Sequence, residues 1–213
     1  MIRVALADDH AVVRRGVRQI LGEAGDIEIV GEAKDYAEVS VLLGKVPCDV
    51  LLLDISMPGK NGIEVLKALR ERMPRLQVLI LSMFPEDQYA VRALKAGAAG
   101  YVSKEAAPET LVDAIRLAAA GRKYITPAVA QALATRVEPH ARAEFPHTTL
   151  SDREYETLRL IASGKKLSEI AELMSLSPKT VSVYRARLLE KMDLRNNVEL
   201  THYAVKHGLV ESR

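Results

Sequence analysis

Polar side chains that could handle a phosphoryl group follow four apolar runs of the sequence. They are Asp8 and Asp9 after Ile2–Ala7, Asp54 after Val50–Leu53, Ser82 after Val78–Leu81, and Lys104 after Gly100–Ser103. A carboxylate at the tip of a buried strand can act as a nucleophile. Three carboxylates in one crevice repel one another, and oxygen ligands favour Mg²⁺ as the ion that offsets this repulsion. We therefore expect a phosphoryl group on Asp54, with Lys104 and Ser82 contacting its oxygens.

These side chains meet only if the apolar runs belong to one parallel sheet. Over residues 1–121, strands are predicted at Ile2–Ala7, Ile27–Ala33, Val50–Leu53, Val78–Leu81 and Gly100–Ser103, and helices at His10–Ala24, Tyr36–Val46, Ile63–Arg72, Asp87–Ala96 and Pro108–Ala120. Apolar strands that alternate with amphipathic helices indicate a parallel sheet covered on both faces. The predicted fold class is α/β, a five-stranded doubly wound sheet of order 2-1-3-4-5. The first and third strands of that sheet flank its ligand-binding crevice.

Residues 1–121 resemble the receiver domain of two-component response regulators. The resemblance rests on Asp8-Asp9, on Asp54-Ile-Ser-Met-Pro-Gly, and on Ser82 and Lys104. It implies that a sensor histidine kinase phosphorylates Asp54. It also implies that Mg²⁺ is held by Asp8, Asp9, Asp54 and the backbone carbonyl of Ser56.

The same resemblance implies a switch beside the phosphoryl group. Ser82 and Lys104 would bind phosphoryl oxygens, and Tyr101 occupies the aromatic switch position, whose ring is expected to turn inward as Ser82 moves. Lys104 is followed by Glu105 rather than by the proline of many receivers, so no cis peptide bond is expected there. Met83 replaces a smaller residue and could narrow access to Asp54.

Composition and charge narrow the class of protein. The chain is 48% hydrophobic and 27% charged, which is typical of a globular protein, and no apolar run approaches the roughly 20 residues of a membrane span. Cys48 is the single cysteine, so an internal disulfide is excluded. The N-terminus reaches acidic residues too soon for a signal peptide, and we expect a cytoplasmic protein without membrane contact. Net charge is −2 over residues 1–121 and +2 in each of 122–146 and 147–213.

Residues 122–146 are predicted to be a linker that contains a short helix. Thr126-Pro127 is typical of a helix start, and Ala128–Arg136 follows it. From Val137 the chain holds two prolines and no apolar period, which indicates a flexible tether. His140 and His147 are expected in solvent rather than on a metal.

Residues 147–213 are predicted to form a small all-α domain of four helices. Ser151 and Glu154 make a capping box, and short helices are expected from there to Gly164 and over Ser168–Met174. Lys179–Met192 and Asn197–His207 complete the set. Two helices joined by a tight turn, the second long and basic, indicate a helix-turn-helix.

The motifs of this region resemble the LuxR/NarL-type DNA-binding domain over residues 148–210. They are Leu150-Ser-Asp-Arg-Glu154, Ile161-Ala-Ser-Gly164, Lys166-Leu-Ser-Glu-Ile-Ala171 and Leu176-Ser-Pro-Lys-Thr-Val181. The resemblance implies base contacts from Ser182, Val183 and Ala186. Phosphate contacts would come from Lys179, Thr180 and Arg187, with Arg185 near the groove. Val198, Thr201 and Val205 are expected to form the dimer contact on DNA. Arg185-Ala-Arg187 and the tail Val198–Gly208 resemble the GacA/UvrY branch most.

The predicted protein is thus a DNA-binding response regulator. It would work as a homodimer on double-stranded promoter DNA, with RNA polymerase as a further candidate partner, and its only chemistry would be phosphotransfer to Asp54 and loss of that phosphate. One alternative is an aspartyl-phosphate phosphohydrolase, but that enzyme needs a second acid at position 56, where this chain has Ser56. Another is a receiver whose C-terminal helices dock proteins instead of DNA.

Overall fold

The computed structural model describes residues 1–57, 61–84, 86–135 and 145–210. Its Cα atoms fall into two compact units, Met1–Val137 and Glu138–Arg213. Pro58, Gly59, His140 and most of the predicted tether lie outside the described residues. Among the described residues, no helix is both long and apolar enough to cross a bilayer.

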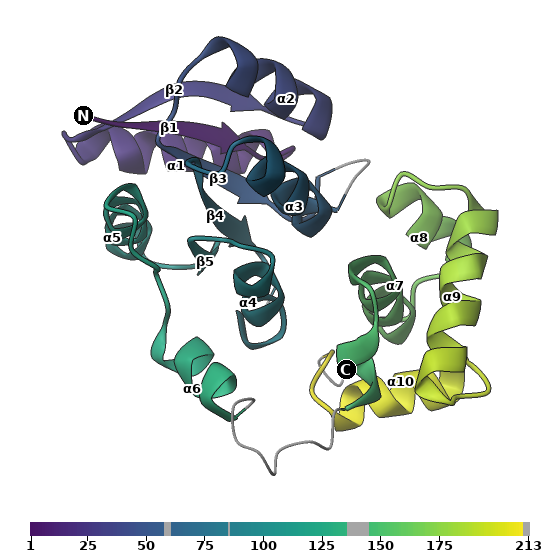
Figure 1. Ribbon diagram of the computed structural model, residues 1–213. Coiled ribbons are helices and arrows are strands. Elements are labelled where there is room, and N and C mark those ends of the chain that lie inside the picture. Colours follow the sequence, from purple (N-terminus) through teal and green to yellow (C-terminus); the bar gives the residue numbers. More distant parts are fainter. Residues whose placement is uncertain (58–60, 85, 136–144, 211–213) are drawn as a thin grey trace. The chain divides into compact units, whose positions relative to one another are not determined.

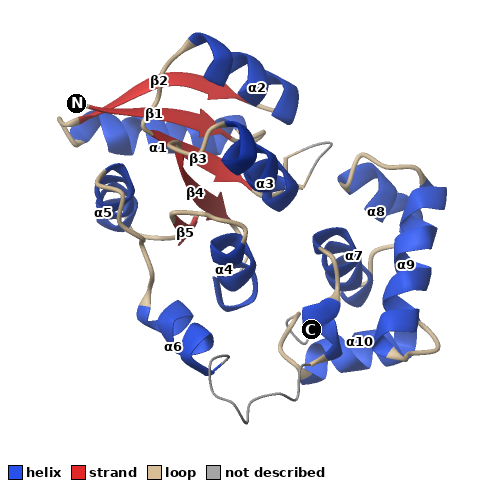
Figure 2. Ribbon diagram, in the orientation of Figure 1, coloured by secondary structure: helices blue, strands red, loops and turns tan. Residues whose placement is uncertain are grey.

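The first unit is a parallel sheet of order β2-β1-β3-β4-β5, flanked by helices on both faces, as the sequence predicts (Figures 1 and 2). Its elements are β1 (Ile2–Ala7), α1 (Ala11–Glu23), β2 (Ile27–Ala33), α2 (Tyr36–Lys45), β3 (Val50–Asp54), α3 (Gly62–Arg72), β4 (Gln77–Ser82), α4 (Glu86–Lys95), β5 (Gly100–Ser103) and α5 (Pro108–Ala119). Each of these elements begins and ends within one residue of its predicted bounds.

Burial explains why the strands read as continuous apolar runs. All five residues of β3 are buried, because helices cover both faces of the sheet. On one face, α1 and α5 pack a shared core, in which Leu21 and Ile115 lie with Leu6, Leu52 and Leu79. In Figure 1, α2, α3 and α4 lie on the other side of the sheet.

Gly62 starts α3 directly against the end of β3. A Cβ atom built on Gly62 would lie 2.6 Å from Ile55 Cα and 2.7 Å from Asp54 O. Only glycine fits so close to a backbone. This contact holds the end of β3, and therefore Asp54, against the first turn of α3.

The first half of the predicted linker packs on the first unit. Tyr124 N donates to Ala99 O, 2.8 Å away, so residues after α5 run beside β5. Helix α6 (Pro127–Thr135) then packs against α4, with Val129 buried. Thr126 Oγ1 donates to Glu86 Oε1 at the start of α4, 3.0 Å away. A short linker helix is therefore present, and it belongs to the surface of the first unit.

The second unit is the predicted bundle of helices. It contains a 3₁₀ turn, η1 (Pro146–Thr149), then α7 (Asp152–Ala162), α8 (Leu167–Leu173), α9 (Pro178–Met192) and α10 (Asn197–Lys206). Helix α7 packs against α9 and α10, and α8 packs against α9. The expectation of a solvated His147 is wrong, because its Nδ1 lies 2.8 Å from the hydroxyl of Tyr203 on α10.

Glu154 joins two helices of the second unit and completes the predicted capping box. Ser151 N donates to Glu154 Oε2 and Glu154 N to Ser151 Oγ, while Lys191 Nζ on α9 lies 2.7 Å from Glu154 Oε2. Burial raises the pKa of Glu154, but the hydrogen bonds from Lys191 and Ser151 outweigh it, so the pKa lies below its usual value.

We expect Glu154→Ala to destabilise the second unit by about 2 kcal/mol, because it removes a cap and leaves Lys191 unpaired. Since the pKa of Glu154 is lowered on folding, its contribution is complete above the usual carboxyl pKa and fades as pH falls through the lowered value. The difference between variant and wild type should therefore shrink in acid. Hydrogen exchange of α7 amides in the full chain measures this, with Glu172→Ala at an exposed position of α8 as control. Equal exchange in both variants would contradict it.

Candidate functional site

Strand register brings the predicted site residues to one edge of the sheet. Ala7 pairs with Leu53, so Asp8 and Asp54 follow side by side. Asp54 pairs with Leu81, which places Ser82 beside the next strand tip, and Ser82 pairs with Ser103. Lys104 N donates to Ser82 O, 2.8 Å away. The carboxyl ends of β1, β3, β4 and β5 thus meet at one edge of the sheet, the position at which the sequence predicts a crevice.

Asp54 lies at the centre of this crevice and is almost fully buried, with 1% of its surface exposed. Its Oδ2 lies 2.7 Å from Lys104 Nζ, and its Oδ1 accepts a hydrogen bond from Ser56 N at 3.0 Å. The same Lys104 Nζ lies 2.7 Å from Asp8 Oδ2. One ammonium group therefore bridges two buried carboxylates, which leaves an excess of negative charge.

Burial and this excess of carboxylates shift the pKa values of both Asp54 and Lys104. Burial raises the pKa of Asp54, and the nearby Asp8 adds to the effect, although Lys104 works against it. Burial alone would lower the pKa of Lys104, but the charge of Asp54 and the contact with Asp8 outweigh it and raise the pKa. Lys104 is therefore charged at neutral pH, and the ionised form of Asp54 is held in a site that disfavours it.

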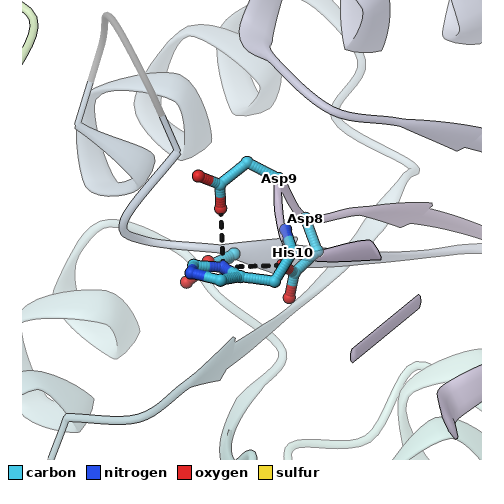
Figure 3. A group of neighbouring side chains, drawn as sticks. Asp8, Asp9 and His10 are labelled. Carbon is cyan, nitrogen blue, oxygen red and sulfur yellow. Dashed lines mark hydrogen bonds and ion pairs between the residues drawn. The ribbon is translucent and has the colours of Figure 1, made fainter. Parts of the chain in front are cut away.

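Asp9 and His10 complete an acidic pocket around Asp54. His10 Nδ1 lies 2.8 Å from Asp9 Oδ1 and 3.3 Å from Asp8 Oδ1 (Figure 3). One potential ligand atom from each of Asp8, Asp9, His10 and Asp54 lies within 4.8 Å of the others. Three carboxylates that face one ammonium are a donor set consistent with a divalent metal site. Sequence reasoning assigned no role to His10, although it directly follows the two aspartates.

Ser82 and Tyr101 lie beside the crevice, and both form a hydrogen bond with the backbone of Phe84. Ser82 is buried and its Oγ accepts a hydrogen bond from Phe84 N at 3.1 Å. The Tyr101 hydroxyl donates to Phe84 O at 2.8 Å, and 2% of this residue is exposed. The ring of Tyr101 is thus already turned inward in this structure, and its movement on phosphorylation stays a prediction.

Helix α9 presents the predicted DNA-contacting residues on its exposed side. Ser177 caps the helix by accepting from Thr180 N, and Pro178 occupies its first position. Its buried side packs into the bundle through Val181, Leu188, Leu189 and Met192. The side chains on the other side are Lys179, Ser182, Val183, Ala186 and Arg187, all exposed, with Thr180 half-buried.

Two cationic side chains of α9, Arg185 and Lys191, are bonded to other helices of the second unit. Arg185 Nε donates to Asn197 Oδ1 at the start of α10, 2.6 Å away. Lys191 pairs with Glu154. Lys179 and Arg187 are thus the α9 cations whose heads lie in solvent without such a bond among the described residues. Sequence periodicity did not reveal the partner Asn197, because the bond joins two helices.

The predicted dimer residues lie on α10. Val198 is 78% exposed and Val205 is 39% exposed, which is high for valine. Thr201 is half-buried, and its hydroxyl donates to Asn197 O within the helix. Val198 and Val205 are seven residues apart and therefore share one face of α10. Exposed valines on one face are consistent with a surface that pairs with another molecule, and their role in dimerisation stays a prediction.

An acidic crevice on a five-stranded parallel sheet, joined to a helix-turn-helix, defines a regulator that couples a receiver to DNA. The family model of the response regulator receiver domain matches residues 4–116, and that of bacterial regulatory proteins of the luxR family matches residues 148–204. The chain belongs to the DNA-binding two-component response regulators. This is a family of regulators and not of catalytic enzymes, which sets the phosphohydrolase alternative aside.

Similar proteins span the whole chain. The response regulator UvrY of Escherichia coli K12 is 40% identical over 210 residues, covering 98% of this chain and 96% of UvrY. The response regulator GacA of Pseudomonas aeruginosa is 37% identical over 212 residues, covering 100% of this chain and 99% of GacA. RcsB of Salmonella enterica serovar Typhimurium, solved on a promoter with a phosphomimetic, is 30% identical with a TM-score of 0.67 over 96% of this chain and 98% of RcsB. The predicted resemblance to the GacA/UvrY branch is thus confirmed.

Proposed function

We propose that a sensor histidine kinase phosphorylates Asp54 and that this controls binding of α9 to promoter DNA. The buried contact of Asp54 with Lys104 at the edge of the sheet is the observation that carries the proposal. A receiver implies a kinase as partner. An Asp54 carboxylate oxygen would attack the phosphorus, and the bond from phosphorus to the kinase imidazole nitrogen would break, with its electron pair staying on that nitrogen.

The residues around Asp54 suit this transfer. Asp8, Asp9, Asp54 and the Ser56 carbonyl would hold Mg²⁺, which when bound would offset the charge of the phosphoryl oxygens. Lys104 would exchange its contact with the Asp54 carboxylate for one with a phosphoryl oxygen. Ser82 would donate a hydrogen bond from its hydroxyl to a second phosphoryl oxygen. This movement would break the hydrogen bond that Ser82 Oγ accepts from Phe84 N.

The connected arrangement of Ser82, Phe84 and Tyr101 supports a route from the phosphoryl group to the surface. Phe84 also stacks on Tyr89 of α4, with ring centroids 4.8 Å apart. A shift of Ser82 would thus reach α4 and, through the Thr126–Glu86 bond, α6. That path would change how the receiver pairs or how it releases the DNA-binding domain.

On DNA, we propose a homodimer that places α9 in the major groove. Ser182, Val183 and Ala186 would contact bases, and Lys179, Thr180 and Arg187 would contact phosphates. Val198, Thr201 and Val205 would form the dimer contact. A solved structure of two RcsB dimers on two parallel DNAs supports pairing on DNA in a similar protein. RNA polymerase is a further candidate partner, and binding to chromosomal DNA would place the protein in the cytoplasm.

Selection of bound genomic fragments by the purified protein tests the proposal. With Mg²⁺ and a small phosphodonor, we expect a defined set of promoter fragments to be enriched at least about tenfold over the unphosphorylated protein, a coupling typical of allosteric switches. Equal enrichment in both conditions would refute control by phosphate. The absence of any enriched fragment would favour the alternative in which the C-terminal helices dock proteins.

A further inference from the structure

Arg14 on α1 reaches back to the end of β1 and contacts the backbone between two of the proposed metal ligands. Its Nη1 donates to Asp8 O at 2.7 Å. This carbonyl belongs to the peptide group that joins Asp8 to Asp9, so the contact fixes the orientation of the backbone from which the Asp9 side chain leaves. The side chain of Arg14 is 19% exposed, and a hydrogen bond that is largely shielded from water is stronger than one at the surface.

A second hydrogen bond holds the guanidinium of Arg14 in place. Its Nε donates to Glu32 Oε2 on β2 at 3.0 Å. Glu32 pairs with Leu6 of β1 in the sheet, so its backbone is fixed relative to the strand that carries Asp8. The guanidinium is planar and rigid, and bonds at two of its nitrogens therefore leave it little freedom to turn. Arg14 thus connects a fixed position of the sheet to the peptide between the two aspartates.

The contact with Arg14 completes the bonding of Asp8. Asp8 N donates to Ala33 O at 3.0 Å, and Asp8 Oδ1 accepts from His10 N at 2.8 Å. Lys104 Nζ lies 2.7 Å from Asp8 Oδ2. The backbone carbonyl is the remaining polar group of Asp8, and Arg14 supplies its donor. Removing Arg14 would release this one group and leave the direct contacts of the Asp8 carboxylate unchanged.

We infer that Arg14 is a positioning residue of the proposed metal site. It holds the peptide between Asp8 and Asp9 so that both carboxylates face the pocket, and it acts through these residues without touching Asp54 or the ion. The inference rests on the proposed metal-dependent phosphorylation of Asp54, since it concerns the same pocket. Residues that orient metal ligands in this way typically change metal affinity by about 10- to 100-fold when they are replaced.

The charge of Arg14 acts in the opposite direction from this positioning role. A cation beside the acidic pocket repels a divalent ion, so by charge alone its removal would tighten Mg²⁺ binding. Loss of positioning would weaken Mg²⁺ binding instead, and the sign of the change therefore separates the two effects. Arg18 offers a matched control on the same helix, because it pairs with Glu32 Oε1 at 2.7 Å and its side chain is 59% exposed. Its printed contacts do not include Asp8.

Calorimetric titration of the full chain with Mg²⁺ tests the inference. We expect Arg14→Ala to weaken Mg²⁺ binding by about 10-fold or more. Arg18→Ala should change the affinity by less than about twofold, because an exposed charge is screened by salt. Arg14→Lys keeps the charge but replaces the rigid fork by one flexible donor, so we expect it to weaken binding by about threefold or more. Wild-type or tighter Mg²⁺ binding in Arg14→Ala, or wild-type affinity in Arg14→Lys, would overturn the inference.

Labelling with a small phosphodonor at increasing Mg²⁺ concentration separates positioning from a loss of folded protein. In Arg14→Ala the Mg²⁺ concentration for half-maximal labelling should rise by about 10-fold, while the rate at saturating Mg²⁺ should stay within about threefold of wild type. A lower rate at saturating Mg²⁺ with unchanged half-saturation would contradict the positioning role. Calorimetry does not depend on phosphorylation: absence of labelling in wild type would refute the proposed function, and the Mg²⁺ affinities would still decide the role of Arg14.

Discussion

Asp54→Asn is expected to abolish labelling of the protein by a small phosphodonor in the presence of Mg²⁺. The amide lacks the nucleophilic oxygen and removes one of the carboxylates proposed to hold the metal. Loss of labelling should exceed about 100-fold, because no nucleophile remains at this position. Intact-mass spectrometry measures the fraction of protein that carries one phosphoryl group. Labelling of Asp54→Asn at the wild-type rate would refute the assignment of the acceptor.

A matched control lies at the other end of the same strand. Asp49 precedes β3 and pairs with Arg3 at 2.8 Å on the surface, far from the carboxyl ends of the strands. Asp49→Asn should therefore keep wild-type labelling, since an ion pair between exposed side chains contributes little to stability. Equal loss of labelling in both variants would mean that general unfolding, and not the acceptor, explains the effect.

Thermal stability is a second measurement on Asp54→Asn, and here the variant is not expected to lose relative to wild type. Because folding raises the pKa of Asp54, its favourable contribution is present below the usual carboxyl pKa and is lost as pH rises through the raised value. At neutral pH the ionised group therefore costs stability, and Asp54→Asn should unfold at the same or a higher temperature than wild type. Lys104 keeps its contact with Asp8 in the variant. A lower Tm at neutral pH would contradict this account of the pocket.

Sequence periodicity predicted the sheet and the edge that carries the site because both depend on local patterns. Strand ends fall where apolar runs stop, and in a parallel sheet the carboxyl ends of neighbouring strands meet at one edge. At that edge the structure brings Asp8, Asp54 and Lys104 into contact. The strand order was predicted as the usual one for a small doubly wound sheet, and the structure has that order.

Contacts between side chains on different elements were beyond the sequence. The bond from Arg185 to Asn197 and the ion pair of Lys191 with Glu154 join helices whose relative rotation no period specifies. The packing of α6 on α4 depends likewise on a tertiary contact, at Thr126 and Glu86. Propensity and pattern describe each helix by itself, whereas these pairs depend on how helices pack.

The bonds of Arg185 and Lys191 within the second unit narrow the set of α9 cations that are free to contact DNA, which is the subject of the second large prediction. With Arg185 held by Asn197 and Lys191 by Glu154, we expect the phosphate contacts of α9 to fall on Lys179 and Arg187. We expect Lys179→Ala together with Arg187→Ala to weaken binding to promoter DNA about 100-fold, since each charged hydrogen bond contributes about 1.5 kcal/mol. The slope of log affinity against log salt should fall by about 2, because each neutralised phosphate contributes roughly 0.9.

Fluorescence anisotropy at several salt concentrations, with the phosphorylated full chain, measures both quantities. Lys206→Ala removes an exposed cation from α10 instead and should leave the slope unchanged, which separates phosphate contact from total charge. The loss should be uniform across DNA sequences, because phosphate contacts position the helix and base contacts select the site. Val183→Ala, by contrast, should change the preferred sequence and keep the slope. A double variant with wild-type slope would mean that the other side of α9, or another element, faces the DNA.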